Sequence, residues 1–435
     1  MKERDRAGAD SHVSCLPPTL SAPVGEAVGT PRRPLRVLVV GAAVAGISVA
    51  RGLLRDGHDV AVFDQRSNVQ VGGGAVTIWS NGETVLRQLG VDMKGAGQLL
   101  SGVRVLTSSG RRLATVDVAA MENRLGAPVR MVPRRVLLER LLDGFPAERI
   151  RCGCRAVGIT TRRGGVRVEF EDGSTAEGDL LIGADGLHST IREVVGAPNA
   201  RPTGWCSWQG LAEFPDLADK QVGLIVIGDR GNLGLWPAGE RELQWWFDLP
   251  WSSDFVRPMR PIDVIRENFG GWTDAVDLLL AKLSDDDLAA SPFPHFRHPI
   301  PAPGQGVLTL LGDAAHTMPP TLAQGTNQAL LDTMVLCAAL SDLRRGTRFG
   351  DVPSALRWYE KTRRRRVAAV SRVASLQVAH GESLLRPAAL MSDRLHTWAL
   401  TTFLRSTSHR RLSARISRDL AANNPIRAPI HSAQR

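Results

Sequence analysis

The chain has few cysteines, and they do not form a pattern that stabilises a fold. An odd, sparse set of thiols suits a reducing compartment and argues against a disulfide-linked secreted scaffold. Cys152 and Cys154 lie close together, but no second Cys or His pair follows them at the spacing of a zinc site. We therefore expect a cytoplasmic protein without a metal site. The five cysteines are Cys15, Cys152, Cys154, Cys206 and Cys337.

The chain also lacks a long hydrophobic run. The uncharged segment 37–50 is too short to cross a bilayer and contains glycines. Residues 1–34 are rich in Pro, Gly, Ser, Ala and charged residues but lack the apolar core of a signal peptide. They are predicted to form a flexible N-terminal tail, and we expect no stable membrane insertion.

Acidic residues are in the minority, with 44 Asp and Glu against 54 Lys and Arg and a net charge of +10. A basic chain can attract nucleic acid, but here the basic residues are scattered and no tract interleaves them with aromatic residues. We interpret the charge as solvated helix faces and expect no nucleic-acid partner. The densest cluster, Arg363–Arg366, is predicted to mark a surface turn of helix.

The regular pattern starts near Arg36. A β-branched run at 37–40 precedes Gly41 and a helical pattern at 42–54, and a second apolar strand follows at 60–63. Strand, tight turn, helix and strand within about 30 residues are typical of the start of a parallel α/β sheet. Further buried strands are predicted at 166–170, 180–182 and 307–312.

The hydrophobic pattern of the sequence changes in the segment 205–255. Short apolar runs alternate there with turns, which predicts a mostly antiparallel sheet inserted into the first domain. Tryptophans concentrated in this segment can line an aromatic substrate cavity or fill the core of the sheet. They are Trp205, Trp208, Trp236, Trp245 and Trp246. After Gly325 the pattern is mostly helical to about Arg418.

The first motif with chemical meaning is the turn 41–46, of sequence Gly-Ala-Ala-Val-Ala-Gly, between strand and helix. Small residues let the backbone approach a pyrophosphate, and the helix N-terminus presents free N–H groups to it. Asp64 ends the second strand at the distance expected of a carboxylate that binds a ribose hydroxyl. The motif predicts a dinucleotide site without distinguishing NAD from FAD, and a nucleotide-free turn stays an alternative.

A second motif, at 183–192, follows a buried strand. Asp185 and Gly186 can place a carboxylate and a close backbone beside a ribose and a phosphate, and Arg192 adds a positive charge. An Asp-Gly pair alone is a common turn. This motif indicates a cofactor site only in combination with the other two motifs.

The third motif starts where a strand ends, at Gly312–Asp313, and continues through the Pro319–Pro320 turn. The carboxylate of Asp313 can accept hydrogen bonds from a sugar-alcohol chain, and the two prolines make a rigid loop with few donors. Gly325 then begins a helix whose N-terminus can hold the negative charge of a reduced flavin. A purely structural strand–loop–helix is the alternative.

Together these motifs resemble those of the group A flavoprotein monooxygenases, the family of para-hydroxybenzoate hydroxylase. They match the family in order and spacing, from about Arg36 to Arg372. Arg134 with Leu137 and Leu141 resembles the family's Arg-x-x-Leu-x-x-x-Leu helix. The family's C-terminal helix is resembled by Ala355, Leu356, Tyr359, Glu360 and Arg363.

The resemblance implies FAD as cofactor and a set of contacts to it. Gly41, Ala43 and Gly46 would line the pyrophosphate, and Asp64 would bind the adenosine ribose. Arg134, Gly312 and Asp313 would contact the pyrophosphate and ribityl region; Pro320, Gly325, Thr326 and Asn327 would border the isoalloxazine; Asp185, Gly186 and Arg192 would serve FAD and NAD(P)H.

The sequence departs from the family's motifs at two positions, and two histidines within the motifs are given no cofactor role. Ala43 stands where the fingerprint has its middle glycine, and Leu322 stands where the family often has glycine, so Leu322 is expected to crowd the loop beside the flavin. His316 and His188 are expected to be structural. No catalytic acid or base is assigned, and only Pro320 and Gly325 are expected beside the reacting ring.

The implied fold class is α/β, with a Rossmann-like FAD-binding domain, an inserted, mostly antiparallel substrate domain and C-terminal helices. The FAD-binding domain is expected at 35–204, with substrate-domain strands near 100–130, and again at 301–345. The substrate domain is expected at 205–300, a C-terminal helical region at 346–425 and a tail at 426–435.

The resemblance further implies a monooxygenase that uses NADPH or NADH and O2. It would hydroxylate, or epoxidise, a small aromatic or polyene-like substrate through a flavin C(4a)-hydroperoxide. A single dinucleotide fingerprint fits transient docking of NAD(P)H and equally fits a separate flavin reductase. The sequence determines neither the substrate nor the oligomeric state.

Two other functions stay open. A flavin-dependent halogenase carries a Trp-x-Trp-x-Ile-Pro motif and a catalytic lysine, whereas the tryptophans in 205–208 have a different spacing and lysine is scarce. A non-catalytic flavin- or ligand-binding protein would carry the same cofactor motifs without turnover.

Overall fold

The computed structural model describes residues 33–69, 73–162, 164–215, 221–290, 292–299 and 303–422. The predicted tail 426–435 and Cys15 lie outside the described residues. So does the predicted tail 1–34, apart from its last two residues, Arg33 and Pro34.

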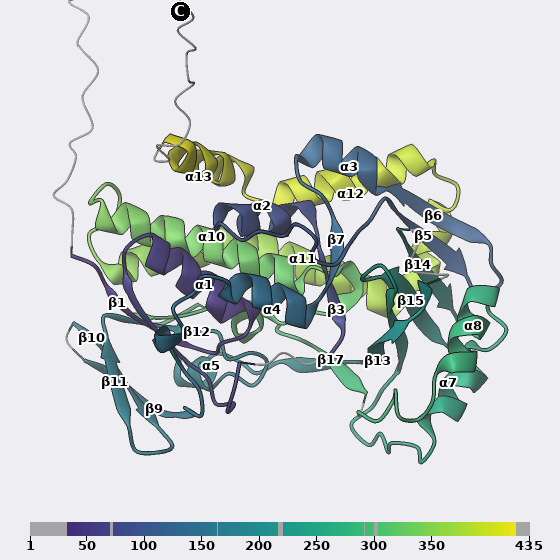
Figure 1. Ribbon diagram of the computed structural model, residues 1–435, viewed down its shortest axis with the longest axis horizontal. Coiled ribbons are helices and arrows are strands. Elements are labelled where there is room, and N and C mark those ends of the chain that lie inside the picture. Colours follow the sequence, from purple (N-terminus) through teal and green to yellow (C-terminus); the bar gives the residue numbers. More distant parts are fainter. Residues whose placement is uncertain are drawn as a thin grey trace, which may run out of the picture.

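A five-stranded parallel sheet lies at the centre of one half of the molecule, with strand order β18-β12-β1-β2-β8 (Figure 1). It confirms the predicted Rossmann-like domain. Along β1 the side chains alternate between two cores: Val37 and Val39 pack against the helices, and Leu38 and Val40 against a small antiparallel sheet. The strands are β1 (Arg36–Val40), β2 (Asp59–Phe63), β8 (Ile150–Arg151), β12 (Leu180–Gly183) and β18 (Leu308–Leu310).

Elements on both faces cover this sheet. Helices α1 (Val44–Arg55), α4 (Arg134–Leu142) and α10 (Gly325–Arg344) share its larger core. The other face is covered by β9 (Ala156–Arg162), β10 (Gly165–Phe170) and β11 (Thr175–Gly178), which form a three-stranded antiparallel sheet.

The other half is built on a seven-stranded sheet, with strand order β17-β13-β16-β15-β14-β5-β6. Only β5 and β14 pair in parallel, so the prediction of a mostly antiparallel sheet is confirmed. Two strands from the segment near 100–130, β5 and β6, belong to this sheet together with the later strands. The strands are β5 (Gly102–Thr107), β6 (Arg112–Asp117), β13 (Arg201–Glu213), β14 (Val222–Gly228), β15 (Gly231–Pro237), β16 (Glu242–Pro250) and β17 (Phe293–Arg297).

Two helices that the sequence did not lead us to predict cover one face of this sheet. They are α7 (Pro261–Phe269) and α8 (Asp274–Lys282), and they share a core with Trp208 and Trp245. The opposite face carries Trp236 and Trp246, which pack toward the elements that connect the two halves. The tryptophans therefore divide between core and inner face.

A small sheet and two helices connect the two halves. The sheet has strand order β3-β7-β4, with β3 (Ala75–Ile78), β4 (Gln98–Leu99) and β7 (Arg130–Pro133). Helix α2 (Ser80–Gln88) follows β3, and α3 (Val118–Leu125) follows β6. Ala75 and Met131 of this sheet share a hydrophobic cluster with Trp236 of the larger one.

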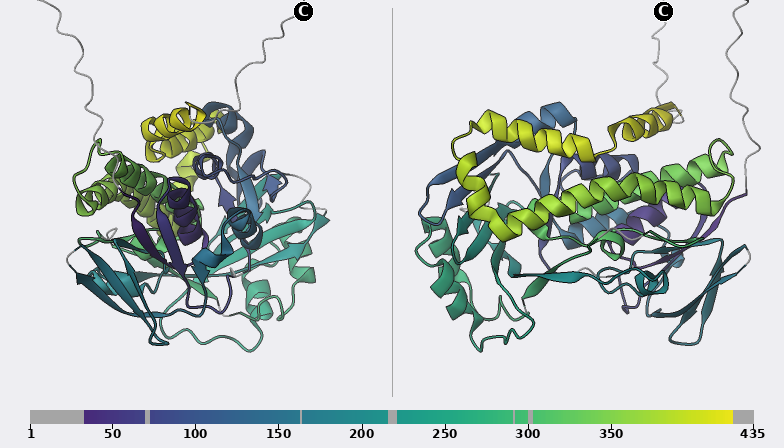
Figure 2. Two further views of the ribbon diagram at one scale, coloured as in Figure 1. Left: turned by 60° about the vertical axis from the view of Figure 1, so that its left-hand side comes forward. Right: turned by 180° about the vertical axis from the view of Figure 1, so that it is seen from behind.

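Four long helices complete the chain, as the helical pattern after Gly325 predicts. After α10 come α11 (Val352–Ala388), α12 (Asp393–Thr407) and α13 (Arg410–Ala422). Figure 2 shows α11 running along most of the length of the molecule, from the parallel sheet toward the antiparallel one. Among the described residues, no helix has the length and apolar character that a membrane span requires.

Candidate functional site

The turn between β1 and α1 needs its two glycines for close packing. Gly41 has φ +108°, and a Cβ there would lie 2.2 Å from the carbonyl oxygen of Ala184. A Cβ on Gly46 would lie 1.8 Å from the oxygen of Gly41. Helix α1 then begins after Ala43 without a side-chain cap, so its first N–H groups are left for an external acceptor such as a pyrophosphate.

Asp64 lies directly after β2 and beside this turn. It is buried, and its two carboxylate oxygens accept hydrogen bonds from the backbone N–H groups of Ala42 (2.7 Å) and Arg66 (2.8 Å). Each carboxylate oxygen can accept a second hydrogen bond. The carboxylate is thus held in a fixed position with capacity left for a ribose hydroxyl.

Arg134 is the clearest sign that a group from outside the chain completes this region. Its backbone N–H donates to the carbonyl oxygen of Gly74, but its Nε is buried and has no partner among the described residues. Burial lowers the pKa of Arg134, and the carboxylate of Asp313 partly offsets that effect. A buried, incompletely paired guanidinium fits an anion, and the pyrophosphate of FAD supplies one.

The second motif places Asp185 and Arg192 differently. Asp185 has one buried carboxylate oxygen without a partner, and burial raises its pKa. Arg192 is only 1% exposed and donates to the carbonyl oxygens of Pro198, Ala314 and Ala315 at 2.8, 2.9 and 3.1 Å. Asp185 can therefore still receive a donor from a cofactor, whereas Arg192 holds the backbone that follows Asp313. The remaining nitrogen of its guanidinium, Nη2, is buried and has no partner among the described residues, so the cofactor contact expected of Arg192 stays a prediction.

The third motif exposes some of its expected cofactor residues to solvent. Gly312 has φ +59°, and after it Asp313 and Pro320 are exposed while the residues between them are buried. Helix α10 begins at Gly325 without a side-chain cap. The free N–H groups at its start, including that of Thr326, are available to a negatively charged ring.

Asn327 and Leu322 depart from the expected picture. Asn327 is fully buried, and its side chain hydrogen-bonds to the protein backbone. It accepts from Trp79 N–H and donates to the carbonyl oxygens of Thr77 and Ala323, each at 2.9 Å. It therefore ties α10 to β3 instead of offering its amide to a ring. Leu322 packs in a cluster with Met318, Val367, Val370 and Phe403, which gives its side chain a place other than the flavin loop.

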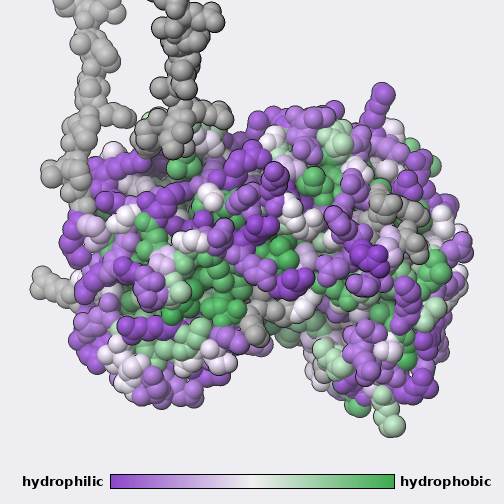
Figure 3. Space-filling view, viewed as in Figure 1, coloured by the Kyte–Doolittle hydropathy of each residue, from purple (hydrophilic) through white to green (hydrophobic). Residues whose placement is uncertain are grey.

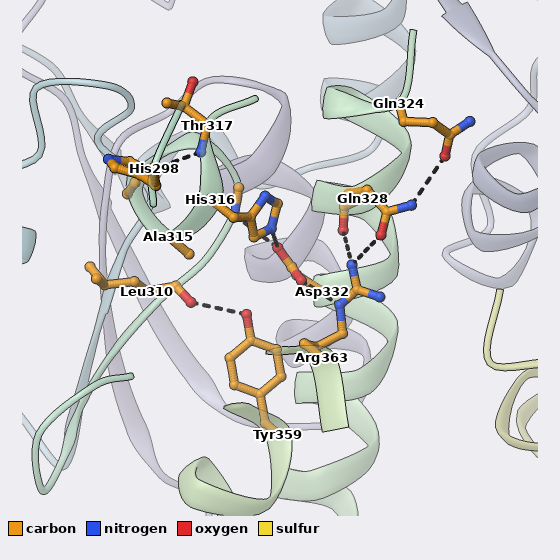
Figure 4. Close-up of polar contacts among 12 residues, drawn as sticks. His298, Leu310, Ala315, His316, Thr317, Gln324, Gln328, Asp332, Tyr359 and Arg363 are labelled. Carbon is orange, nitrogen blue, oxygen red and sulfur yellow. Dashed lines mark hydrogen bonds and ion pairs between the residues drawn. The ribbon is translucent and has the colours of Figure 1, made fainter. Parts of the chain in front are cut away.

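Behind this loop lies a buried polar network, shown in Figure 4. Asp332 on α10 bonds the backbone N–H of Gly312 (2.9 Å), Nε2 of His316 (2.5 Å) and Nε of Arg363 (2.6 Å). His316 is therefore a hydrogen-bonding structural residue, as expected. Arg363 is 3% exposed, so its assignment to a surface turn was wrong: the side chain points inward from α11 because Asp332 needs a counter-charge.

Helix α11 is fastened to the parallel sheet next to this network. The hydroxyl of Tyr359 donates to the carbonyl oxygen of Leu310 on β18 at 2.9 Å (Figure 4). Glu360 accepts from the backbone N–H of Gly304 and from the hydroxyl of Thr309, both at 2.8 Å. These contacts account for the residue types in the C-terminal helix as structural attachments.

The inner face of the antiparallel sheet lies toward the FAD-binding half. The side-chain oxygen of Gln244 accepts from the backbone N–H of Ala75 at 2.5 Å, which joins β16 to β3. Leu211, Ile225 and Trp246 lie on the same face and are partly exposed. Figure 3 shows that the two halves form lobes with an indentation between them at the lower edge of the view.

The structure also brings together three buried polar residues of this sheet that sequence reasoning missed. Ser207 on β13 contacts both Asp248 on β16 and His295 on β17. The available signal was weak: Ser207 and Asp248 each follow apolar or aromatic residues within a strand that also carries other polar residues. Among the described residues, no group of His, Cys, Asp and Glu could hold a metal ion.

Comparison with known proteins identifies relatives over most of the chain. Residues 34–374 match the family described as "FAD binding domain". The FAD-dependent urate hydroxylase of Klebsiella oxytoca is 31% identical over 77% of this chain and 87% of its own. A 3-amino-4-hydroxybenzoate 2-monooxygenase of Streptomyces platensis is 30% identical over 78% of this chain and 86% of its own. The structure of Klebsiella pneumoniae HpxO complexed with FAD and uric acid is 27% identical, with a TM-score of 0.72, and the match covers 89% of this chain and 97% of that one.

Proposed function

Because the chain belongs to the FAD-binding family of group A flavin monooxygenases, we propose that it hydroxylates a small aromatic or heteroaromatic ring with electrons from NADPH or NADH. The enzyme is an FAD-dependent monooxygenase, and the proposal concerns its substrate and its residues. Relatives named for urate and for an aminohydroxybenzoate favour a planar ring with polar substituents. Epoxidation is the less favoured outcome.

The observation that carries the proposal is the set of unmet polar groups around the cofactor motifs. The free start of α1, the buried Nε of Arg134 and the unpaired oxygen of Asp185 would be satisfied by the phosphates and hydroxyls of FAD. Asp64 would bind the adenosine ribose, and Asp313 the ribityl chain. The Nε of Arg134 and one carboxylate oxygen of Asp185 have no partner among the described residues, and Asp64 keeps capacity for a further hydrogen bond beyond those from Ala42 and Arg66.

The protein's contribution to the reaction follows from these positions. FAD, when bound, takes a hydride from NAD(P)H and passes electrons to O2. The backbone N–H groups at Gly325 and Thr326 would stabilise negative charge on the ring, because a helix N-terminus carries a positive partial charge. The Pro319–Pro320 turn would border the ring without offering it donors. The apolar side chains of Leu211, Ile225 and Trp246 would exclude water from the opposite side.

The experiment is a substrate panel scored on the purified enzyme. The FAD content is measured first, by its visible absorption. Hydroxylated aromatic acids, purines and pyridines are then tested for NADH and NADPH oxidation, and products formed under ¹⁸O2 are analysed by mass spectrometry. We expect one label-carrying oxygen in a hydroxylated ring.

Three results would decide against the proposal or narrow it. A protein without FAD would contradict it outright. Reduced nicotinamide consumed only to form peroxide, across the whole panel, would contradict ring hydroxylation. Turnover only after addition of a flavin reductase would keep the chemistry and change the source of electrons.

A further inference from the structure

Three polar side chains from three strands of the antiparallel sheet meet in the interior. Ser207 Oγ lies 2.6 Å from His295 Nε2 and also contacts the Oδ1 oxygen of Asp248 in a short hydrogen bond. The exposed fractions are 5% for Ser207, 6% for Asp248 and 1% for His295. Polar groups buried this deeply carry a desolvation cost, so their retention in an otherwise apolar sheet calls for an explanation.

This cluster lies on the inner face of the sheet. Ser207 alternates with Cys206 and Trp208, which belong to the core beneath α7 and α8, so its side chain points to the opposite face. Asp248 is two residues from Trp246 on that face, and the indole of Trp246 bonds the Asp248 carboxylate. The cluster is therefore on the side that the sheet presents to the FAD-binding half.

Strand β17 connects the cluster to the flavin loop. His298, three positions after His295, exchanges two hydrogen bonds with the backbone of Thr317: its N–H donates to the Thr317 oxygen (3.0 Å), and its Nδ1 accepts from Thr317 N–H (2.9 Å) (Figure 4). Thr317 directly precedes the Met318–Pro319–Pro320 segment. Phe293, which pairs with Ser207 in the register of β17 with β13, is 54% exposed, so this end of β17 reaches the surface.

The electrostatic surroundings suit proton transfer. Burial raises the pKa of Asp248 to about 7, which the hydrogen bonds from Ser207 and Trp246 only partly offset. Burial lowers the pKa of His295 to about 4, so its ring stays neutral near neutral pH. The titratable groups near Asp248 are His295 and the buried thiol of Cys206, and among the described residues its only ion-pair partner is His295.

One end of the cluster has no partner in the part of the chain that the structure describes. Nδ1 of His295 is buried there and makes no hydrogen bond. A buried ring nitrogen left open at the end of a bonded chain points to a group that arrives with a ligand, directly or through a water.

We propose that His295, Ser207 and Asp248 form a relay that removes a proton from an acidic hydroxyl or ring N–H of the substrate. The inference rests on the proposed ring hydroxylation and adds the substrate class: an aromatic or heteroaromatic compound with an ionisable group on the ring. Ionisation raises the electron density of the ring and so favours attack by an electrophilic oxygen.

The relay balances without an oxidant or a co-reactant. The substrate O–H (or N–H) bond breaks, and an N–H bond forms at His295 Nδ1. The Nε2–H bond of His295 breaks as Ser207 Oγ gains that proton, and the original Ser207 proton passes to Oδ1 of Asp248. At the end His295 is neutral in its other tautomer, Asp248 is a neutral acid, and the negative charge has moved to the substrate.

The test uses the oxidised, FAD-loaded enzyme and p-nitrophenol, whose anion absorbs visible light. The ionisation midpoint of the bound phenol is measured between about pH 5 and 9. In D248N no buried acceptor remains, so we expect the midpoint to rise by about one pH unit or more relative to the wild type. S207A should give the same rise, and S207T, which keeps a hydroxyl, should restore the wild-type midpoint.

The matched controls are His58→Gln, which alters another buried histidine, and Asp342→Asn, which alters another buried aspartate. Both should leave the midpoint unchanged. An equal midpoint in the wild type, D248N and S207A would overturn the relay, and so would a wild-type enzyme that does not bind p-nitrophenol. Because FAD content is measured first, a protein without FAD would instead count against the proposed function.

Discussion

Two buried aspartates, one in each half of the molecule, have opposite electrostatic surroundings. Burial alone would raise the pKa of Asp332, but His316 and Arg363 outweigh it and bring the pKa to about 2. Asp248 has no comparable cation, and burial raises its pKa to about 7. The first carboxylate is a permanent anion, whereas the second exchanges a proton near neutral pH.

The difference distinguishes groups that hold the fold from groups that face a ligand. Around Asp332 both carboxylate oxygens have partners, and those partners belong to the loop and the helices that shape the flavin site. Each network ends at a buried histidine Nδ1 without a partner among the described residues, that of His316 in the first and that of His295 in the second. What separates the two networks is the cation: Arg363 fixes the negative charge of Asp332, whereas Asp248 has no such counter-charge among the described residues and can exchange its proton.

Among the tests of this difference between Asp332 and Asp248, the largest loss of stability is expected for Asp332→Asn. The substitution leaves the guanidinium of Arg363, only 3% exposed, without its counter-charge. Breaking a buried ion pair from one side costs about 3–5 kcal/mol. We expect the free energy of unfolding, measured by urea denaturation at neutral pH, to fall by that amount.

Asp248→Asn serves as the comparison in the same experiment. Asparagine keeps a hydrogen-bonding group for Ser207 and removes a carboxylate that burial already disfavours as an anion. We expect no comparable loss at neutral pH. Equal losses in the two variants would show that the two aspartates do not differ in the way described.

Next in size is an effect on cofactor affinity at Arg134. Replacing it with methionine removes a guanidinium whose buried Nε has no partner among the described residues, so the apoprotein should not lose stability. A hydrogen bond to a charged group is worth about 1.5–3 kcal/mol, which corresponds to a loss of roughly 10–100-fold in FAD affinity. Titration of the apoprotein with FAD measures it.

The neighbouring Arg135 provides the control for that substitution. Its side chain is 62% exposed and lies 3.9 Å from Glu242, so Arg135→Met should bind FAD like the wild type. If Arg134→Met binds FAD with unchanged affinity, the open guanidinium does not belong to the cofactor site.

The cofactor half was predictable because its signals are local. Glycine at positions 41 and 46, the proline turn and the strand patterns each predict a conformation within a short stretch of chain. What local signals do not give is the direction of a side chain. Asn327 and Arg363 were recognised as motif residues, yet one binds the backbone of β3 and the other points into the core.

The inner-face cluster could not be predicted for a related reason. Ser207 is 41 residues from Asp248 and 88 residues from His295 in sequence, and the three meet only through the register of β13 with β16 and β17. That register depends on the whole sheet. Helices α7 and α8 were missed as well, although they form the cover of that sheet.

A change of stability that is spread over several pH units tests Asp248 directly. A carboxyl group whose pKa is raised in the folded state contributes stability that is complete below its unfolded pKa and is lost as the pH rises through about 7. The wild type should therefore lose about 1 kcal/mol per pH unit relative to D248N between about pH 4 and 7. A difference that stays flat across this range would contradict a raised pKa.

The smallest effect is expected for a third buried aspartate, which has a cationic partner, as Asp332 does, but one that is exposed to solvent. Asp342 on α10 is 5% exposed, but its partner Arg415 on α13, 3.2 Å away, is 41% exposed. Solvent screens such a pair, so Asp342→Asn should cost at most about 1 kcal/mol, and about 1 M salt should abolish the difference from the wild type. Urea denaturation at low and high salt measures both values. A loss as large as that of Asp332→Asn would mean that burial of the carboxylate alone, and not exposure of its partner, decides the cost.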